Sequence, residues 1–172
     1  RWNLLMCSEI NRHKNGTEWR NFYGRFKGKS LSPAQSEALL THYEKYSLEN
    51  ISWDENPQRK KIKLSEIFRE KSVWLEIGFG GGEHLIHQAK LNPDIGFIGC
   101  EPYQNGMAKL MGKLISNPCQ NIKLYDGDVR TVFDVLAKNS ISKVFLLYPD
   151  PWPKKRHHRR RFVTQEFLAP LY

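Results

Sequence analysis

The sequence predicts an α/β protein whose parallel sheet carries helices on both faces, the doubly wound arrangement. From residue 72 onward, short apolar stretches alternate with segments of helical periodicity, which is typical of successive β-α-β units. A glycine-rich turn, Gly78-Phe-Gly80-Gly-Gly82, follows the first strand, and an acidic residue lies at or just after the end of each of four strands. Parallel sheets of this class bind ligands at the carboxyl ends of their strands, so we expect a nucleoside-type ligand at that edge.

The predicted strands span residues 72–77, 95–100, 121–126 and 142–148. The first is rich in bulky apolar residues, as expected for a strand that is buried on both faces. Helices are expected over residues 83–91, 103–116 and 129–138, and a further helix is expected to begin near Phe162. Methionine and leucine recur at helical spacing in the second of these helices, so its methionines are predicted to lie in the core.

Residues 1–63 are predicted to form a basic N-terminal arm with one helix and a linker, and residues 64–172 the ligand-binding domain. Ser32-Pro33-Ala-Gln35 has the pattern of a capping box with proline at the first helical position. The helix is expected to end near Tyr46 and to dock through one apolar stripe, formed by Leu39, Leu40, Tyr43 and Tyr46. Residues 49–63 read as a loop, and residues 62–69 as a short helix.

Composition indicates one globular domain, because 172 residues with 40% hydrophobic and 12% aromatic content can build a real core. No apolar run approaches the roughly 20 residues of a membrane span, and the first residues are too short for a secretory signal. Cys7, Cys100 and Cys119 are odd in number and far apart, which favours reduced thiols over a disulfide framework or a metal cluster. We therefore expect a cytoplasmic protein without a metal; the sequence does not distinguish a monomer from a homodimer.

The net charge of +9 is concentrated in a few stretches. Residues 1–30 and 59–63 are basic, and residues 154–161 contain six Lys and Arg side chains and no acid. Segregated positive charge on a folded protein indicates a polyanionic partner, most simply a nucleic acid. The alternative for any single run is an ordinary solvated surface.

The spacing of the glycine turn narrows the ligand class. Glu83 occupies the place of the last glycine of a dinucleotide fingerprint, and no lysine followed by serine or threonine closes a phosphate loop. The acidic-x-Gly-x-Gly-x-Gly pattern from Glu76 to Gly82 instead resembles the loop of S-adenosylmethionine-dependent methyltransferases, with Gly78 and Gly80 close to the cofactor. A tight strand-to-helix turn without a ligand is the alternative.

Four acids mark the predicted strand ends: Glu76, Glu101, Asp128 and Asp150. An acid after the second strand can accept hydrogen bonds from both ribose hydroxyls, which gives Glu101 the more specific assignment. An acid after the third strand can accept from an adenine amino group, although Asp128 could simply cap the following helix. Asp126 is the competing candidate nearby.

The segment after the fourth strand, Tyr148-Pro-Asp150-Pro-Trp152-Pro153, is followed at once by the basic run 154–161. Proline disfavours helix in the preceding residue, so Asp150 and Trp152 are expected in an extended, stiff segment at the mouth of the site. The Trp152 ring beside a fixed carboxylate would suit a purine. A rigid loop whose tryptophan covers the core is the alternative.

Together these motifs resemble the tRNA (guanine-N7-)-methyltransferase family. The similarity covers Gly24-Arg25, Leu31-Ser-x-x-Gln35, Leu75 to Gly82, Gly99-x-Glu101, Asp128, and Phe145 to Trp152 with its basic tail. It implies a Rossmann-like methyltransferase fold, S-adenosylmethionine as cofactor, and 7-methylguanosine in the variable loop of tRNA as product. The implied cofactor contacts are Glu76, Glu101, Asp128 and Asp150, with Asp150 in the catalytic role. The implied tRNA contacts are Arg25, Lys154, Arg156, His157, His158, Arg159, Arg160 and Arg161.

The resemblance breaks off at the end of the chain. Tyr172 falls within the expected helix after the fourth strand, whereas family members continue through further strands, so we expect a truncated chain and a sheet that is incomplete after its fourth strand. His84 and His87 have the spacing of a metal pair but lack a third ligand, and are interpreted as ordinary helix residues. Two alternative functions remain: a methyltransferase of another RNA or a protein, and an RNA-binding relative without catalysis.

Overall fold

The computed structural model describes residues 22–69 and 71–171 of the chain. The first part of the predicted arm, residues 1–21 with Cys7, therefore lies outside the described residues. Within the described ranges no helix is long and apolar enough to cross a membrane. Cys100 and Cys119 are buried free thiols.

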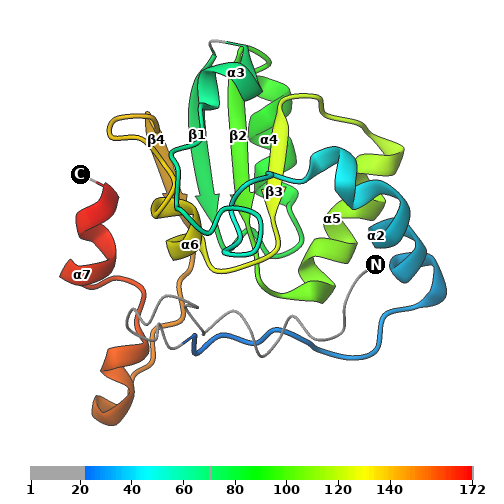
Figure 1. Cartoon of the computed structure of the whole chain (residues 1–172). Coiled ribbons are helices and arrows are strands. Elements are labelled where there is room, and N and C mark those ends of the chain that lie inside the picture. Colours follow the sequence, from blue (N-terminus) through cyan, green and yellow to red (C-terminus); the bar gives the residue numbers. More distant parts are fainter. Residues whose placement is uncertain (1–21, 70, 172) are drawn as a thin grey trace.

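Four parallel strands form the sheet at the centre of the molecule (Figure 1). They are β1 (Ser72–Ile77), β2 (Ile95–Cys100), β3 (Ile122–Tyr125) and β4 (Lys143–Leu146), in the order β3-β2-β1-β4. Ile77 pairs with Cys100 on one side and with Leu146 on the other, so the strands end nearly level. The strand order reverses between β1 and β4, which places the topological switch point of the fold at the carboxyl ends of these two strands.

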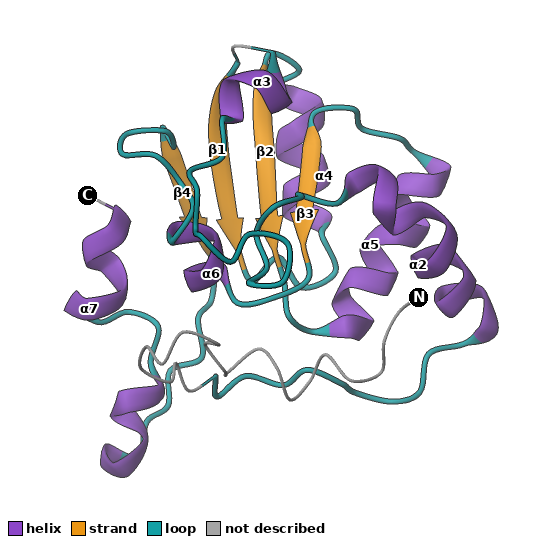
Figure 2. Ribbon diagram, viewed as in Figure 1, coloured by secondary structure: helices purple, strands orange, loops and turns teal. Residues whose placement is uncertain are grey.

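Helices cover both faces of the sheet (Figure 2), which confirms the predicted doubly wound α/β class. The cluster on one face contains side chains of α2 (Pro33–Tyr46), α4 (Glu83–Leu91) and α5 (Gln104–Ser116). The cluster on the other face contains side chains of α3 (Leu64–Phe68) and α6 (Val129–Phe133). The chain then continues through the 3-10 helix η1 (Lys155–Arg160), α7 (Gln165–Leu168) and η2 (Ala169–Leu171).

Alternation along the strands divides the core between these two layers. Phe97 of β2 belongs to the α4 and α5 side, whereas the neighbouring Ile98 belongs to the α3 and α6 side, and both are fully buried. Successive side chains of a strand point to opposite faces, so a strand between two helical layers needs apolar residues at every position. This explains why β2, which lies between β1 and β3, has no charged or strongly polar residue along its length.

The predicted element ends needed correction where tertiary contacts intervene. The helix expected over residues 129–138 ends at Phe133, because the Val135 carbonyl accepts a hydrogen bond from the Ile62 amide of the linker, 2.9 Å away. The fourth strand, expected to reach residue 148, ends at Leu146, and Tyr148 has a positive φ of 51°. That conformation cannot continue a strand.

Helix α2 begins with the predicted capping box. The Ser32 hydroxyl accepts from the Gln35 amide at 3.3 Å, and the Gln35 side chain accepts from the Ser32 amide at 3.0 Å. Leu39 and Tyr46 are buried against the domain, but Leu40, expected in the same stripe, is 61% exposed. Leu40 follows Leu39 directly and is therefore rotated by about 100° from the buried face.

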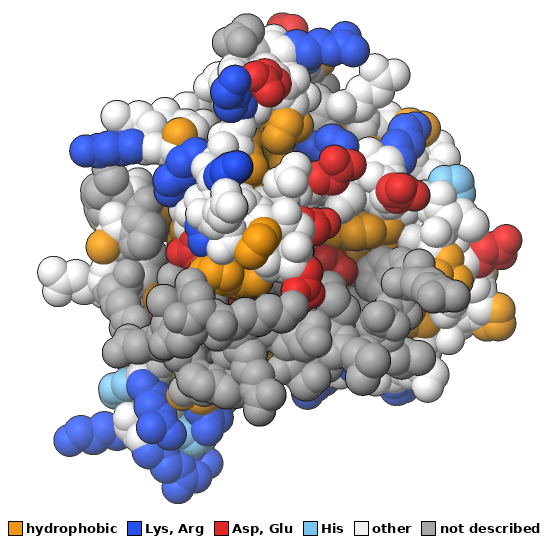
Figure 3. Space-filling model, in the orientation of Figure 1, with side chains coloured by type: hydrophobic (Ala, Val, Ile, Leu, Met, Phe, Trp, Pro, Cys, Tyr) orange, Lys and Arg blue, Asp and Glu red, His pale blue; other side chains and the backbone are white. Residues whose placement is uncertain are grey.

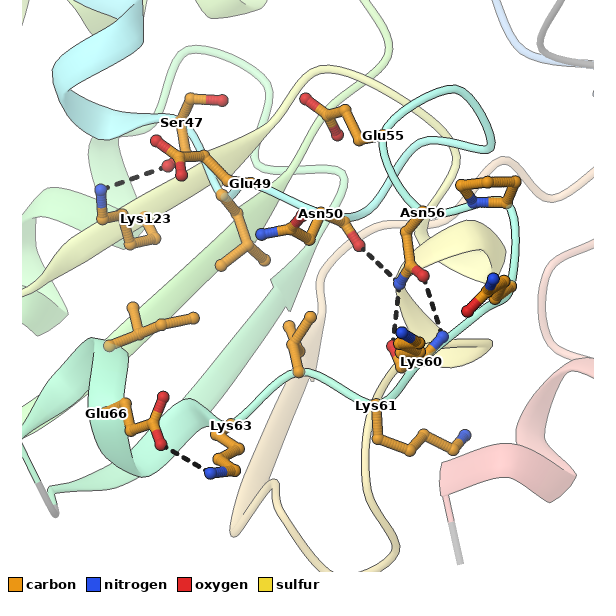
Figure 4. Close-up of a pocket in the computed structure, with 15 residues that line it drawn as sticks. Ser47, Glu49, Asn50, Glu55, Asn56, Lys60, Lys61, Lys63, Glu66 and Lys123 are labelled. Atoms are coloured by element: carbon orange, nitrogen blue, oxygen red, sulfur yellow. Dashed lines mark hydrogen bonds and ion pairs between the residues drawn. The ribbon is translucent and has the colours of Figure 1, made fainter.

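The linker after α2 is ordered around Asn56, which is buried although it is polar (Figure 4). Its amide nitrogen donates to the Asn50 and Lys60 carbonyls at 3.1 and 2.8 Å, and its oxygen accepts from the Lys60 amide at 2.9 Å. The linker borders a cleft of about 840 Å³ beside β3. Within this cleft Lys63 forms an ion pair with Glu66, and Lys123 donates to the Ser47 carbonyl.

We expect Asn56→Ala to destabilise the fold by about 2 kcal/mol, because it leaves buried backbone groups without partners. Gln58→Ala is the matched control, since Gln58 lies in the same loop with an exposed side chain, and a change within about 0.5 kcal/mol is expected. Urea denaturation of both variants measures the difference. Equal stabilities would show that the Asn56 hydrogen bonds do not hold the linker.

Candidate active site at the carboxyl edge of the sheet

A cavity of about 580 Å³ lies at the switch point of the sheet. It is lined by the end of β1 with its glycine turn, the end of β2, the start of α6, and the segment after β4. Residues 22–25 of the arm close it from the side, since the Phe26 carbonyl and Gly28 amide are hydrogen bonded to Gln104 and Asn105 at the start of α5. The arm crosses this edge of the sheet in Figure 1. Five separate segments of the chain thus converge on one cavity.

The glycine turn presents its backbone to this cavity through Gly78, whereas Gly80 is not among the lining residues. Gly78 and Gly80 have φ values of 70° and 57°, a region that other residues occupy only with strain. A Cβ built at either position meets no atom within 4 Å, so open space lies in front of the turn. The turn therefore offers a place where a ligand can approach the main chain closely.

The turn is held by Glu101, which directly follows β2, and by Lys113 of α5. The Glu101 carboxylate accepts from the Gly80 amide at 2.7 Å and from the Tyr103 amide at 2.9 Å. Lys113 of α5 donates to the Gly81 carbonyl at 2.7 Å and pairs with Glu83. Gly106, also on α5, lies so close that a Cβ there would be 2.4 Å from the Gly80 carbonyl oxygen. The conformation of the turn thus depends on its contact with α5.

We expect Gly106→Ala to destabilise the protein by about 1–3 kcal/mol, because the new methyl group would overlap backbone that cannot move freely. Gly112→Ala is the control in the same helix: its Cβ meets nothing within 4 Å, so a gain of about 0.5–1 kcal/mol from helix propensity is expected. Thermal unfolding of the two variants should shift in opposite directions. Stabilisation by both would disprove the tight contact between α5 and the turn.

Glu101 is one of three predicted acids that line the cavity, with Asp128 and Asp150. Its side chain is buried, and burial raises the pKa of the carboxyl while the two backbone amides oppose that shift. Each carboxylate oxygen uses one acceptor position for a backbone amide and retains another for a ligand. The two amides thereby fix the orientation in which Glu101 can receive hydroxyl donors.

Glu76 occupies a different place, behind the turn, and does not line the cavity. Its carboxylate contacts the His84 imidazole of α4 at 2.8 Å. Burial raises the pKa of Glu76, and the hydrogen bond and charge interaction with His84 oppose the rise. His84, interpreted from the sequence as an ordinary helix residue, therefore links the end of β1 to the first turn of α4.

Asp128 lines the cavity and also begins α6 as its N-cap. The Arg130 backbone amide donates to the Asp128 carboxylate at 2.9 Å, and the Arg130 guanidinium forms an ion pair with it. The competing acid, Asp126, contacts Tyr43 instead, because its backbone amide donates to the Tyr43 hydroxyl. Burial raises the pKa of Asp126. Arg130, which sequence reasoning missed, follows Asp128 by two residues, a spacing that could have suggested the pair.

The proline-rich segment brings Asp150 to the cavity with an exposed side chain. Trp152, expected in an extended conformation, has a positive φ of 39°, which corrects that expectation. The turn at Trp152 folds the chain back, so that the Arg161 guanidinium donates to the Pro151 and Trp152 carbonyls at 2.9 and 3.2 Å. These bonds provide the physical reason for the unusual conformation.

Arg160 points back toward the cavity, between the arm and the proline segment. Its guanidinium lies over the Tyr23 ring at 5.2 Å and over the Trp152 ring at 5.0 Å. Its Nε is buried and has no hydrogen-bond partner in the described part of the chain. Arg160 thus joins residues of the arm to the segment after β4 through cation–π contacts.

Four of the six Lys and Arg side chains of the basic run face solvent. Lys154, Lys155, Arg156 and Arg159 are exposed, and these cations gather on the projecting η1 segment at the lower left of Figure 3. Desolvation lowers the pKa of His157, and repulsion from Arg160, Lys154 and Arg159 adds to this effect. His158 is exposed within the same segment, and Arg25 of the arm lines the cavity.

Among residues 22–69 and 71–171, no group of three or more His, Cys, Asp or Glu side chains is arranged to hold a metal ion. Sequence reasoning did not find Lys113 or the Arg160 stack, because each depends on a partner far along the chain or on a turn that proline rules do not predict. The contact between His84 and Glu76 depends on the directions of two side chains on either side of the glycine turn, which the sequence does not give. The position of the acids at the strand ends could be predicted from the sequence, because parallel strands bring their carboxyl ends to one edge of the sheet.

Comparison with known proteins places this geometry in a family. The family described as "Putative methyltransferase" matches residues 70–172, more than half of the chain. The tRNA (guanine-N(7)-)-methyltransferase of Ruegeria sp. (strain TM1040) is 56% identical over 160 residues, which are 93% of this chain and 63% of that protein.

Two further relatives carry the same name. The protein of Roseobacter denitrificans is 57% identical over 152 residues, covering 88% of this chain and 65% of its own length. The protein of Agrobacterium fabrum is 45% identical over 153 residues, covering 88% and 63%. The chain thus spans less than two thirds of the length of these curated relatives. With its Rossmann-like sheet, its glycine turn and the matched residues 70–172, the chain belongs to this methyltransferase family.

Proposed function

We propose that the chain transfers a methyl group from S-adenosylmethionine to N7 of a guanine in tRNA, in the variable loop, giving 7-methylguanosine. The observation that carries the proposal is the convergence of the glycine turn, Glu101 and Asp150 on one cavity, with exposed cations beside it. The relatives named tRNA (guanine-N(7)-)-methyltransferase support the choice of substrate.

The cavity fits S-adenosylmethionine in its donor and acceptor chemistry. Gly78 and Gly80 leave open space at the backbone, where the methionine half could approach. The Glu101 carboxylate retains acceptor positions for a ribose diol, and Asp128 reaches the wall where an adenine amino group could donate. We assign Glu76 a supporting role, because it holds the turn through His84 and does not reach the cavity.

The proposed chemistry does not require a general base. Bound S-adenosylmethionine would supply an electrophilic methyl group on a sulfonium ion. Guanine N7 carries a free lone pair at neutral pH, so no residue has to remove a proton before the methyl group is transferred. The contribution of the protein is then alignment of donor and acceptor, which can account for several kcal/mol of the barrier.

Asp150 is the residue that we propose to orient the guanine. Within the described part of the chain, its exposed carboxylate takes part in no hydrogen bond or ion pair and is therefore available to accept from the guanine amino and imino groups. Its negative charge would also favour the cationic product. In this role Asp150 touches the reacting base without accepting its proton.

Glu101→Gln is expected to weaken S-adenosylmethionine binding about tenfold, because hydrogen bonds to a charged acceptor contribute about 1.5–3 kcal/mol. A neutral amide has one acceptor oxygen where the carboxylate has two, and the second backbone amide would face an NH₂ group. Isothermal titration calorimetry on the purified chain measures the change. Glu44→Gln on the exposed face of α2 is the matched control and should bind normally.

Thermal unfolding of Glu101→Gln shows whether the variant remains folded at the titration temperature. A folded variant with unchanged cofactor affinity would remove Glu101 from the site. If the variant also transferred methyl groups at the normal rate, another residue would have to bind the ribose, and the proposed reaction would still stand.

The direct test is methyl transfer from radiolabelled S-adenosylmethionine to an unmodified tRNA transcript. We expect label in 7-methylguanosine after nuclease digestion and chromatography. Chain cleavage by aniline after borohydride reduction then maps the modified position. Label in another nucleoside would favour a methyltransferase of different specificity, and binding of both ligands without transfer would favour the non-catalytic RNA-binding alternative.

A further inference from the structure

An aromatic side chain projects into solvent at the mouth of the cavity. Tyr148 is 98% exposed, more than any other large hydrophobic residue in the described ranges, and it lines the cavity two residues before Asp150. Its side chain forms no hydrogen bond, ion pair or ring contact with another residue in the described ranges. The fold thus holds a full aromatic face in water at the edge of the site.

The backbone at this position is strained. Tyr148 has a φ of 51° and precedes Pro149. Residues other than glycine rarely adopt such values, and a following proline favours an extended conformation. Strain of this kind is retained where the surrounding structure fixes it, often at binding sites. The positive φ explains why Tyr148 does not continue strand β4. The packing of the described residues gives no reason for an aromatic side chain at this position.

Trp152, the aromatic residue that the sequence suggested for a purine, already packs against the protein. The Arg160 guanidinium lies over its ring at 5.0 Å, and the His157 ring meets it edge-on at 5.6 Å. Other aromatic side chains of the cavity are similarly engaged: Phe162 stacks on Phe167 at 5.6 Å, and Tyr23 lies under Arg160. Tyr103, which also lines the cavity, has its hydroxyl end against Gly28 of the arm. The fully exposed ring at the mouth is therefore that of Tyr148.

The charges around Tyr148 indicate the kind of ligand. Exposed Lys154, Lys155, Arg156 and Arg159 follow it within eleven residues and would hold a phosphate backbone close to the mouth. Single-stranded or extruded bases are bound by stacking on aromatic side chains beside such basic grooves. A base that must reach a cavity also has to leave its own stack, and a protein ring can replace the lost contact.

We propose that Tyr148 is the stacking residue for the guanine that receives the methyl group. The inference rests on the proposed function and adds to it the surface that holds the extruded base while Asp150 contacts its polar edge. Trp152 and Arg160 then serve to hold the proline segment against the arm.

The test is a thermodynamic cycle between Tyr148 and the base. Tyr148→Leu keeps an apolar side chain without a π-face, and Tyr148→Phe keeps the π-face. The probes are two tRNA transcripts, one with guanine at the methylated position and one with an abasic site there. We expect Tyr148→Leu to weaken binding of the guanine transcript about tenfold, which is the effect expected for the loss of one stacked base. The abasic transcript should bind the leucine variant and the unmodified chain equally, and Tyr148→Phe should behave like the unmodified chain.

Each outcome decides the proposal. Equal loss on both transcripts, or no loss on either, overturns stacking on the target base. S-adenosylmethionine affinity should be the same in all variants, and a loss confined to that cofactor would assign Tyr148 to the cofactor instead and overturn the inference. If Tyr148→Leu weakens only the guanine transcript but no methyl group is transferred, the proposed reaction alone is contradicted. If methyl transfer occurs but Tyr148→Leu affects both transcripts equally, the stacking alone is contradicted.

Discussion

Asp150→Ala is expected to lower the turnover of methyl transfer about a hundredfold, while binding of S-adenosylmethionine changes little. The reason is geometric: the exposed carboxylate at the mouth of the cavity is proposed to orient guanine, and a misplacement of about 1 Å in a reacting group can slow a reaction by that factor. Single-turnover assays at saturating tRNA isolate this step from substrate binding. Asp94→Ala is the matched control, because Asp94 is exposed at the turn before β2, at the opposite edge of the sheet.

Solvent isotope effects separate orientation from proton removal. If Asp150 only accepts hydrogen bonds, no proton is in transfer when the methyl group moves, and single-turnover rates should be nearly equal in H₂O and D₂O. A markedly slower rate in D₂O, with the difference lost in Asp150→Asn, would overturn the account in which N7 attacks without a base.

The fold was predictable from the sequence because its pattern is local. β1 and β2 have the predicted bounds, since each is a six-residue apolar run between clear turn signals. The predicted end of α6 was wrong, because the position where this helix ends depends on a hydrogen bond from Ile62, more than 70 residues earlier in the chain. Local periodicity carries no information about such a partner.

The candidate site also has features that the sequence could predict and features that it could not. Glu101 and Asp150 could be placed at the carboxyl edge from the order of strands alone, and the structure brings both to the cavity. Whether an acid there is free or engaged could not be read from the sequence: Asp128 pairs with Arg130, and Glu76 with His84. Those pairings depend on side-chain directions fixed by helices α6 and α4, which composition does not determine.

The basic run gives the second large effect, a strong dependence of tRNA binding on salt. Six cations follow Pro153 in sequence, but the structure separates them into two groups. Lys154, Lys155, Arg156 and Arg159 are exposed, whereas Arg160 lies over two aromatic rings and Arg161 donates to two carbonyls of the proline segment. We therefore expect the first four to bind phosphates, and the last two to hold the wall of the cavity.

If the four exposed cations neutralise about four phosphates, the log–log salt slope should be about −3 to −4, and affinity should fall about a hundredfold between about 50 and 200 mM salt. Replacing all four with alanine should flatten the slope by about three units and leave S-adenosylmethionine binding unchanged. Filter binding of a tRNA transcript across a salt series measures the slope, and calorimetry measures the cofactor.

Arg160→Ala with Arg161→Ala is the matched control, because it removes two cations from the same run but from the inward group. We expect its salt slope to stay within about one unit of the unmodified chain, since neither guanidinium is free to hold a phosphate. Thermal stability should fall instead, because the proline segment loses two hydrogen bonds and its cation–π contacts to the arm. A slope flattened by two or more units would show that RNA draws Arg160 and Arg161 out of these contacts, and the division of the run into two groups would then be wrong.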